Sequence, residues 1–335
     1  MPPRYFEDVF EKLLESHDVT YRQVDASLVL EPSTGSELRL REYQGSPAEV
    51  AGWMPGIEIL VVQGAPVTDA VLGASRDLKL VGCARGGPVN IDVDAVTARG
   101  LPLVNTPGKN AEAVADLTLA FLVMLARGLP RAQRFLAEGN RLRDNWEGAK
   151  FIGSDLRRHV LGLVGYGAIG RLVAERARPF GLGVIVFDPF VSVDLDGVEQ
   201  VGTLGELLAR SDFVSLHARA SAENENLIDA DALAAMRPGA WLVNTARETL
   251  VDEDALDAAL ESGRLAGAAL DVVRTSTESG AHRLLRHSNV VITPHLGGAT
   301  HETLLQGAEM IAEEIRRFAA GEPLVNVVNR AAAAA

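Results

Sequence analysis

The feature that most constrains the fold of this chain is a glycine-rich stretch, Leu161–Gly170, between an apolar strand pattern and a helical pattern. It contains the spacing Gly-x-Gly-x-x-Gly, which is a weak signal alone and a stronger one in this context. In a nucleotide-binding βαβ unit, Gly165 permits the tight turn, Gly167 lets a pyrophosphate approach the backbone, and Gly170 lets the helix pack close to the strand. The helix N-terminus offers unpaired N–H groups to that pyrophosphate. The stretch therefore predicts a dinucleotide-binding α/β domain.

An acidic residue follows the glycine stretch at the distance expected for a ribose-binding carboxylate. The second apolar strand ends at Asp188, which lies 18 residues after Gly170, close to the roughly 20 typical of NAD-binding folds. A carboxylate here would bind the adenosine ribose hydroxyls and repel a 2′-phosphate, which favours NAD over NADP. Ala168 and Ile169, at the start of the helix, are further expected cofactor contacts. The competing interpretation is a glycine-rich turn beside a surface aspartate, but the combined pattern favours the nucleotide site.

Strands alternate with helical patterns along most of the chain, which predicts βαβ units and parallel sheets. In the first third, the strand candidates are Ile57–Val62 and Leu78–Gly82. From His159 onward, six apolar runs match the size of a complete dinucleotide-binding sheet. These runs are Val160–Val164, Gly183–Phe187, Phe213–Leu216, Ala240–Asn244, Ala268–Asp271 and Val290–Ile292. We expect Glu302–Phe318 to form a last helix that returns to the first domain.

A break at Asn105–Gly108 divides the chain into two predicted domains. The helical pattern that follows is apolar nearly all round, so we expect this helix to be buried between the domains or against a second subunit. The substrate domain is predicted to be discontinuous, residues 1–105 plus 300–330, with a cofactor domain at 106–299. The predicted fold class is α/β, with two doubly wound parallel-sheet domains and the active site in the cleft between them. The alanine run at 331–335 is interpreted as a tail.

Composition and missing motifs exclude several classes of function. The formal net charge of −13 argues against a nucleic-acid partner. The single cysteine, Cys83, rules out an intrachain disulfide and suits a reducing cytoplasm. Neither a signal-peptide pattern nor an apolar run of about 18 residues is found, so export and a membrane span are not expected. The absence of Gly-x-Ser-x-Gly and His-Glu-x-x-His argues against hydrolase and zinc-protease chemistry, and no metal site is predicted.

Three further stretches lie at the ends of predicted strands in the cofactor domain: Leu242–Asp254, Ala266–Val272 and Ile292–Thr300. With Gly86–Asp92, Val104–Gly108 and the glycine stretch, they make the chain resemble the D-isomer-specific 2-hydroxyacid dehydrogenases, in particular the phosphoglycerate dehydrogenase-like members. The resemblance covers nearly the whole length, with several separate motifs in the expected order. It implies an NAD-dependent oxidoreductase that moves a hydride between nicotinamide and C2 of a small D-2-hydroxy acid.

The resemblance implies roles for individual side chains. Arg247 would bind the substrate carboxylate and polarise the C2 oxygen, a planar, bidentate task that suits a guanidinium. His295 would exchange the proton of the C2 oxygen, because imidazole titrates near neutral pH. In the first domain, a loop would hold the substrate carboxylate through its N–H groups; its residues are Arg85, Gly86 and Gly87. Arg85 itself is either a direct ligand or a surface arginine.

Other residues are implied to contact the cofactor rather than the substrate. They are Thr245, Ala246, Asp271 and Gly297, and Asp271 would lie near the nicotinamide ribose or carboxamide. His217 follows the end of a predicted strand, so it would either line the adenosine side or pack in the core. A homodimer through residues 110–127 is expected from the apolar pattern and the resemblance together.

The chain departs from the family at the partner of the catalytic histidine. A glutamate normally follows the Asp271 position by five residues, and that position here is Ser276. A carboxylate beside His295 would raise its pKa and fix its tautomer, so its loss should weaken acid catalysis near neutral pH. Glu278 or Ser276 would take over this role, or activity is impaired, or the enzyme is tuned to a substrate that does not need this partner. A milder departure is Glu248-Thr249, where small residues usually follow the arginine.

Two alternatives stay open at this point. Within the family, a phosphoglycerate or sugar-acid dehydrogenase would need several cations in the first domain, where Arg39, Arg41 and Arg85 are available. In a different class, an NAD-binding regulatory or scaffold protein on the same fold is favoured by the missing glutamate. The presence of Arg247 and His295 favours the enzyme.

Overall fold

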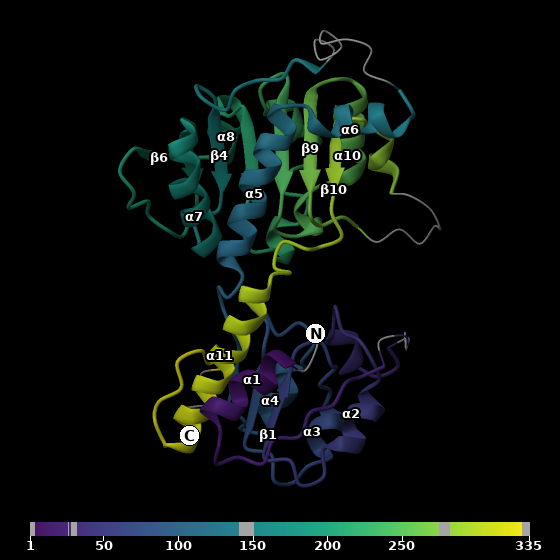
Figure 1. The fold of residues 1–335 in the computed structure, drawn as a ribbon, viewed down its shortest axis with the longest axis vertical. Coiled ribbons are helices and arrows are strands. Elements are labelled where there is room, and N and C mark those ends of the chain that lie inside the picture. The colour runs from purple at the N-terminus through teal and green to yellow at the C-terminus, as the bar shows by residue number, and fades with distance from the viewer. Residues whose placement is uncertain (1–3, 26, 28–31, 141–150, 275–281, 330–335) are drawn as a thin grey trace. The chain divides into compact units, whose positions relative to one another are not determined.

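The computed structural model describes residues 4–25, 27, 32–140, 151–274 and 282–329, which divide into two compact units. Unit 1 comprises Met1–Asn110 with Ala299–Ala335, and unit 2 is the continuous segment Ala111–Gly298. Each unit is built on a parallel sheet, which confirms the predicted α/β class (Figure 1). The predicted tail at 331–335 lies outside the described residues. The assignment of unit 1 to the substrate stays a prediction.

Unit 2 contains a seven-stranded parallel sheet in the order β10-β9-β8-β7-β4-β5-β6. Its strands are β4 (Val160–Val164), β5 (Gly183–Phe187), β6 (Val198–Gln200), β7 (Phe213–Leu216), β8 (Ala240–Asn244), β9 (Leu265–Leu270) and β10 (Val290–Ile292). The order runs outward in both directions from β4, so the switch point of this doubly wound sheet lies between β4 and β7. Each predicted strand of this domain has a counterpart, although β9 begins three residues before Ala268 and ends before Asp271. The edge strand β6 was not predicted.

Helices cover both faces of the unit 2 sheet. They are α5 (Ala111–Ala126), α6 (Leu129–Ala137), α7 (Ala168–Ala177), α8 (Leu204–Arg210), α9 (Ala230–Ala235) and α10 (Glu253–Glu261), with 3-10 turns η3 (Arg178–Phe180), η4 (Ala222–Asn224), η5 (Glu248–Leu250) and η6 (Arg283–Arg286). Alternate strand residues face opposite layers, so Leu161 and Leu163 pack with α5 and α7, whereas Val164 packs in the cluster that includes α8, α9 and α10. Helix α5 is buried as predicted, but against the sheet of its own unit (Figure 1). Its apolar surface therefore does not require a second subunit.

Unit 1 contains a three-stranded parallel sheet in the order β1-β2-β3. This order follows the chain without a reversal, so the predicted doubly wound order is found in unit 2 and not among the described strands of unit 1. Its elements are β1 (Ile59–Val62), β2 (Leu80–Cys83), β3 (Leu103–Val104), α1 (Arg4–Leu13), α2 (Pro47–Trp53), α3 (Asp69–Gly73), α4 (Val93–Ala98), α11 (His301–Ala319) and the 3-10 turn η1 (Glu37–Arg39). Helices α2, α3 and α4 contribute to the core on one face, and α1 packs with α11 on the other. The last helix therefore returns to the first domain, as predicted.

Within the described ranges, no single helix is long and apolar enough to cross a membrane. Helices α5 and α6 meet the length and composition test only as a pair, and the pair is bent by 70°. Helix α5 is a core helix of unit 2.

Candidate active site

The loops that carry the predicted residues of unit 2 leave the same edge of its sheet. The residues that follow β4, β7, β8 and β9 are Gly165, His217, Thr245 and Asp271. Because these strands are parallel, their carboxyl ends share one edge, which is where open α/β sheets bind ligands. The strand β10, also parallel, ends just before Thr293 and His295.

The glycine loop between β4 and α7 has the backbone geometry that only glycine tolerates easily. Gly165 adopts a φ of 101°, and a Cβ there would lie 2.8 Å from the backbone of His217 and Ala218. A Cβ on Gly170 would collide with the carbonyl oxygen of Gly165. Gly167 is the N-cap of α7, and nothing lies within 4 Å of a Cβ built on it. The loop therefore provides an open space beside a helix N-terminus, which fits a dinucleotide pyrophosphate.

The Asp188 carboxylate, which follows β5, already serves the glycine loop. One oxygen accepts a hydrogen bond from Tyr166 N at 2.8 Å, and the other accepts from Phe190 N at 2.8 Å and Val191 N at 3.1 Å. A carboxylate offers about four lone-pair positions, so capacity for one further donor is left. The structure thus gives Asp188 a role in positioning the loop, and its contact with a ribose stays a prediction.

His217 lies directly at the switch point of the sheet. Its Nε2 is 2.9 Å from the Ser215 hydroxyl, and burial lowers its pKa to about 4. Its Nδ1 is buried and has no hydrogen-bond partner among the described residues. Leaving a buried polar atom unpaired costs about 1–3 kcal/mol. A neutral imidazole with a spare nitrogen beside Gly165 fits a bound cofactor better than a simple packing role.

A buried asparagine, which we did not single out from the sequence, shapes the loop after β8. Asn244 donates through Nδ2 to Arg247 O at 2.8 Å and accepts from Ala246 N at 3.0 Å. Arg247 is half-buried, and its Nη1 donates to Ala246 O at 2.7 Å. The Thr245 and Thr118 hydroxyls are 3.2 Å apart. The only sequence signal for Asn244 was an amide at the end of an apolar strand.

Asp271 organises the turn that carries His295. This carboxylate, 2% exposed, accepts hydrogen bonds from Thr293 Oγ1 at 2.5 Å, Leu296 N at 2.9 Å and Gly297 N at 2.7 Å. The Asp271 carbonyl also accepts from His295 N at 2.9 Å. His295 adopts a positive φ of 54° and its side chain is exposed. Asp271 therefore positions the histidine, and its predicted contact with the nicotinamide side is a further, separate role.

Ser276 and Glu278, the candidates to replace the family glutamate, lie outside the described residues. Residues on both sides of that segment are tied to Glu253, a buried carboxylate at the start of α10. It accepts from Arg274 N at 2.6 Å and lies 3.2 Å from His282 Nε2.

The predicted substrate loop follows β2 in unit 1. The Arg85 carbonyl accepts from Thr106 N at 3.0 Å, and the Gly86 carbonyl accepts from Asn105 Nδ2 at 2.8 Å. Arg85 is ion-paired with Glu42. Gly87 completes the loop beside them, and the approach of this loop to the unit 2 residues in one cleft stays a prediction.

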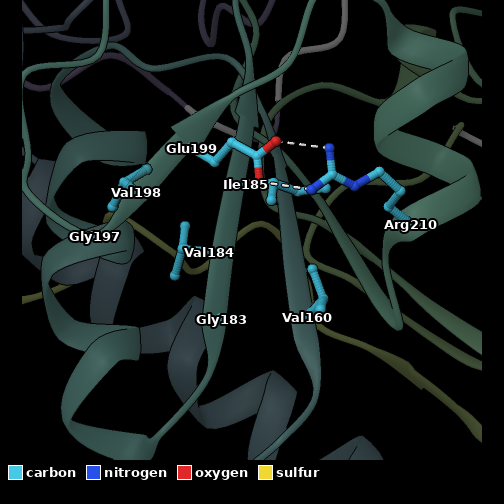
Figure 2. Close-up of a pocket in the computed structure, with 8 residues that line it drawn as sticks. All are labelled: Val160, Gly183, Val184, Ile185, Gly197, Val198, Glu199 and Arg210. Carbon is cyan, nitrogen blue, oxygen red and sulfur yellow. Dashed lines mark hydrogen bonds and ion pairs between the residues drawn. The ribbon is translucent and has the colours of Figure 1, made fainter.

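A separate pocket of about 450 Å³ lies at the amino edge of the unit 2 sheet (Figure 2). Val160 and Gly183, the first residues of β4 and β5, line it, so it is at the opposite edge from the glycine loop. Figure 2 shows Glu199 facing Arg210, with an ion pair of 2.6 Å, and Glu206 binds the same guanidinium at 2.8 Å. Because two carboxylates already neutralise its arginine, this pocket is a poor anion site.

Comparisons with known proteins agree on one family. A model described as "D-isomer specific 2-hydroxyacid dehydrogenase, NAD binding domain" matches residues 119–297. The chain is 39% identical over 311 residues to a D-3-phosphoglycerate dehydrogenase of Mycobacterium tuberculosis, covering 90% of this chain and 57% of that protein. A D-3-phosphoglycerate dehydrogenase of Synechocystis is 37% identical, covering 85% and 51% respectively. The chain thus spans a little more than half the length of these curated relatives.

Solved structures with the same fold cover both units. The crystal structure of the TT0316 protein from Thermus thermophilus has a TM-score of 0.75 and 36% identity, covering 84% of this chain and 89% of that chain. D-lactate dehydrogenase from Aquifex aeolicus, complexed with NAD and lactic acid, has a TM-score of 0.76 and 26% identity, covering 98% and 97%. The predicted family, fold class and NAD cofactor are confirmed by these matches. Because the domain model covers more than half of the chain, we conclude that this chain belongs to the D-isomer specific 2-hydroxyacid dehydrogenase family.

Proposed function

We propose that this chain is an NAD-dependent oxidoreductase that transfers a hydride between nicotinamide and C2 of a small D-2-hydroxy acid or 2-keto acid. The observation that carries the proposal is the shared sheet edge from which the glycine loop, the Arg247 loop and the His295 turn emerge. Membership of the family supports the reaction class. The proposal also assigns the Arg85–Gly87 loop of unit 1 to substrate binding.

Each side chain has a defined task in this reaction. Arg247 binds the substrate carboxylate and the C2 oxygen through its guanidinium fork. In the oxidation direction, His295 takes the hydroxyl proton while the hydride leaves C2, so that C2 becomes a carbonyl carbon. When bound, NAD supplies the acceptor of that hydride and its reduced form supplies the donor. Asp271 holds the turn of His295 in place through three hydrogen bonds.

His295→Ala tests the central assignment. We expect turnover to fall by about 10²–10⁴-fold, the usual contribution of a general acid–base residue, while NADH affinity stays close to that of the parent chain. The matched control is His17→Ala, a histidine of unit 1 outside the proposed site. The assignment is wrong if His295→Ala keeps full activity or loses NADH binding.

The reaction itself is tested by NADH consumption with glyoxylate, pyruvate, hydroxypyruvate and larger 2-keto acids at acidic to neutral pH. We expect NADH to be consumed with at least one of these acids, because reduction of C2 takes up the hydride that NADH supplies. If none of these acids is reduced although fluorescence shows that NADH binds, the result would favour the regulatory or scaffold alternative. A second candidate, D-3-phosphoglycerate oxidation, is supported by the similarity to the D-3-phosphoglycerate dehydrogenases of Synechocystis and Mycobacterium tuberculosis.

Asp188→Ala tests the cofactor preference. Because the carboxylate would repel a 2′-phosphate, we expect the preference for NADH over NADPH to narrow by about tenfold, roughly 1.4 kcal/mol. Asp194→Ala is the control, since Asp194 is an exposed carboxylate in the segment after β5 that pairs with Arg171. The ratio of kcat/KM for the two cofactors is the measurement, and an unchanged ratio in Asp188→Ala contradicts the ribose assignment.

We also propose a homodimer that works in the cytoplasm. The proposed interface lies at the side of residues 110–127 that the unit 2 sheet leaves exposed, and it continues onto α6, where Leu129 and Leu136 are exposed. The reduced single cysteine, Cys83, is compatible with the cytoplasm. Light scattering should give twice the chain mass of 35.7 kDa, and a monomeric mass would contradict the dimer.

A further inference from the structure

The predicted substrate arginine of unit 1 is already bound by a carboxylate of the same unit. Arg85 donates through Nη1 to the Glu42 carbonyl at 2.8 Å, and its Nη2 is ion-paired with the Glu42 carboxylate. A guanidinium fork binds a substrate carboxylate through two such nitrogens. Glu42 adopts a positive φ of 50°, a region that non-glycine residues rarely occupy, and in this conformation it engages both nitrogens.

The backbone around this pair is fixed rather than loose. Arg41 N donates to Val89 O at 2.7 Å, which joins the Glu42 segment to the chain two residues after the substrate loop. The ammonium group of Lys109, a residue only 7% exposed, donates to Ala84 O at 2.7 Å just before the loop. The Arg85 and Glu42 side chains are 23% and 36% exposed. The ion pair is therefore partly exposed, and the backbone that carries Glu42 is held by the Arg41–Val89 hydrogen bond.

Two N–H groups of the loop are available for a single carboxylate. Within the part of the chain that the structure describes, the N–H groups of Gly86 and Gly87 donate no hydrogen bond. Nothing lies within 4 Å of a Cβ built on Gly87, so space beside it is open. Adjacent backbone N–H groups of this kind form anion-binding concavities.

Arg39, a second cation that could bind a phosphate, is also paired with a carboxylate of unit 1. Arg39 binds Asp92 through both Nε at 3.1 Å and Nη2 at 2.6 Å, and Asp92 is buried. Of the three arginines that the sequence offered for a phosphate, Arg41 alone has an exposed side chain with no partner among the described residues. A phosphate placed beside Arg85 would meet the negative charge of Glu42.

We propose that Glu42 is a specificity-determining residue that restricts the site to 2-keto acids whose single anionic group is the carboxylate, and that it disfavours phosphorylated substrates. This inference rests on the proposed function, in which the Arg85–Gly87 loop binds substrate. The inference argues against D-3-phosphoglycerate oxidation, the second candidate activity, because the phosphorylated 2-keto acid of that reaction carries a second anionic group.

The experiment compares hydroxypyruvate with 3-phosphohydroxypyruvate, which differ by the phosphate. We expect the parent chain to favour hydroxypyruvate in kcat/KM by about tenfold or more, since a like charge beside the ligand weakens binding. Glu42→Gln keeps the shape and removes the charge, so it should narrow that preference by about tenfold, mainly through KM for the phosphorylated substrate. Glu58→Gln is the matched control, because Glu58 pairs with Lys79 elsewhere in unit 1.

A binding measurement separates this inference from the reaction. Calorimetry follows D-glycerate and 3-phospho-D-glycerate binding to the enzyme–NADH complex, where no turnover is possible. The role of Glu42 is supported if D-glycerate binds more tightly than 3-phospho-D-glycerate and if Glu42→Gln narrows this difference in affinity. If this result is obtained but no 2-keto acid is reduced, the proposed reaction is wrong and the role of Glu42 is not. If the parent chain reduces 3-phosphohydroxypyruvate with a higher kcat/KM than hydroxypyruvate, the proposed reaction is supported and the role of Glu42 is overturned. Loss of that preference in Arg41→Ala would then identify Arg41 as the phosphate ligand.

Discussion

At the scale of single residues, His217 makes the stability of this chain depend on pH. Burial lowers its pKa from 6.5 to about 4, so between these values the unfolded chain binds a proton that the folded chain does not. The free energy of unfolding therefore falls as the pH drops through this window, and the contribution is fully present only above pH 6.5. A shift of this size corresponds to about 3 kcal/mol.

The variant His217→Asn removes this titration. We expect its free energy of unfolding, from urea denaturation, to fall less between pH 7 and pH 4.5 than that of the parent chain, because Asn carries no titrating group. The variant His17→Asn provides the comparison at a residue without the buried environment. Parallel pH profiles for the parent chain and His217→Asn would refute the role of burial at this position.

The residues of the site differ in how far the sequence could predict them. Gly165 and Gly170 were predictable because their roles depend on near neighbours in the chain, apart from the contact of Gly165 with the His217 backbone. Glu42 was not, because its pairing with Arg85 joins residues 43 positions apart. No local pattern encodes such a contact, since it depends on how β2 and the segment before α2 pack in three dimensions.

At the scale of elements, β4 and α8 pack so closely that the strand requires a glycine. A Cβ on Gly162 would collide with the Ser211 hydroxyl and lie 2.6 Å from Leu207 Cδ2. We expect Gly162→Ala to destabilise the protein by about 1–3 kcal/mol, the usual effect of overpacking a core. Gly205 lies in α8, and nothing lies within 4 Å of a Cβ built on it. We expect Gly205→Ala to stabilise the protein by about 0.5 kcal/mol.

Thermal unfolding of these two variants measures the difference directly. A melting temperature that falls for Gly162→Ala and rises slightly for Gly205→Ala supports the packing argument. Equal shifts in the two variants would show that α8 moves away from β4 at little cost.

The elements that the sequence predicted are those with long or strongly apolar patterns. The five-residue runs of β4, β5 and β8 were identified with their observed bounds. The strands β3, with two residues, and β6, with three, were missed. Such short segments carry too few residues for periodicity to distinguish a strand from a turn, and β6 has a largely exposed edge position.

At the scale of the whole molecule, each unit has hydrophobic clusters of its own. The two clusters of unit 2 contain buried residues from Ala115 to Val290, and those of unit 1 draw only on its own two segments. A segment that buries its own core is expected to fold alone. Since the chain enters and leaves unit 2 once, the continuous segment 111–298 can be produced without new connections.

This segment provides the last prediction. Because the glycine loop, Asp188 and His217 all lie within 111–298, we expect the isolated segment to bind NADH with an affinity within about tenfold of the full chain, or roughly 1.4 kcal/mol. It should reduce no 2-keto acid, because the proposed substrate loop Arg85–Gly87 lies in unit 1 and is absent from the segment. Fluorescence titration with NADH and a turnover assay test both statements. A folded segment that fails to bind NADH would mean that unit 1 contributes to the cofactor site, and a segment that keeps turnover would remove unit 1 from the reaction.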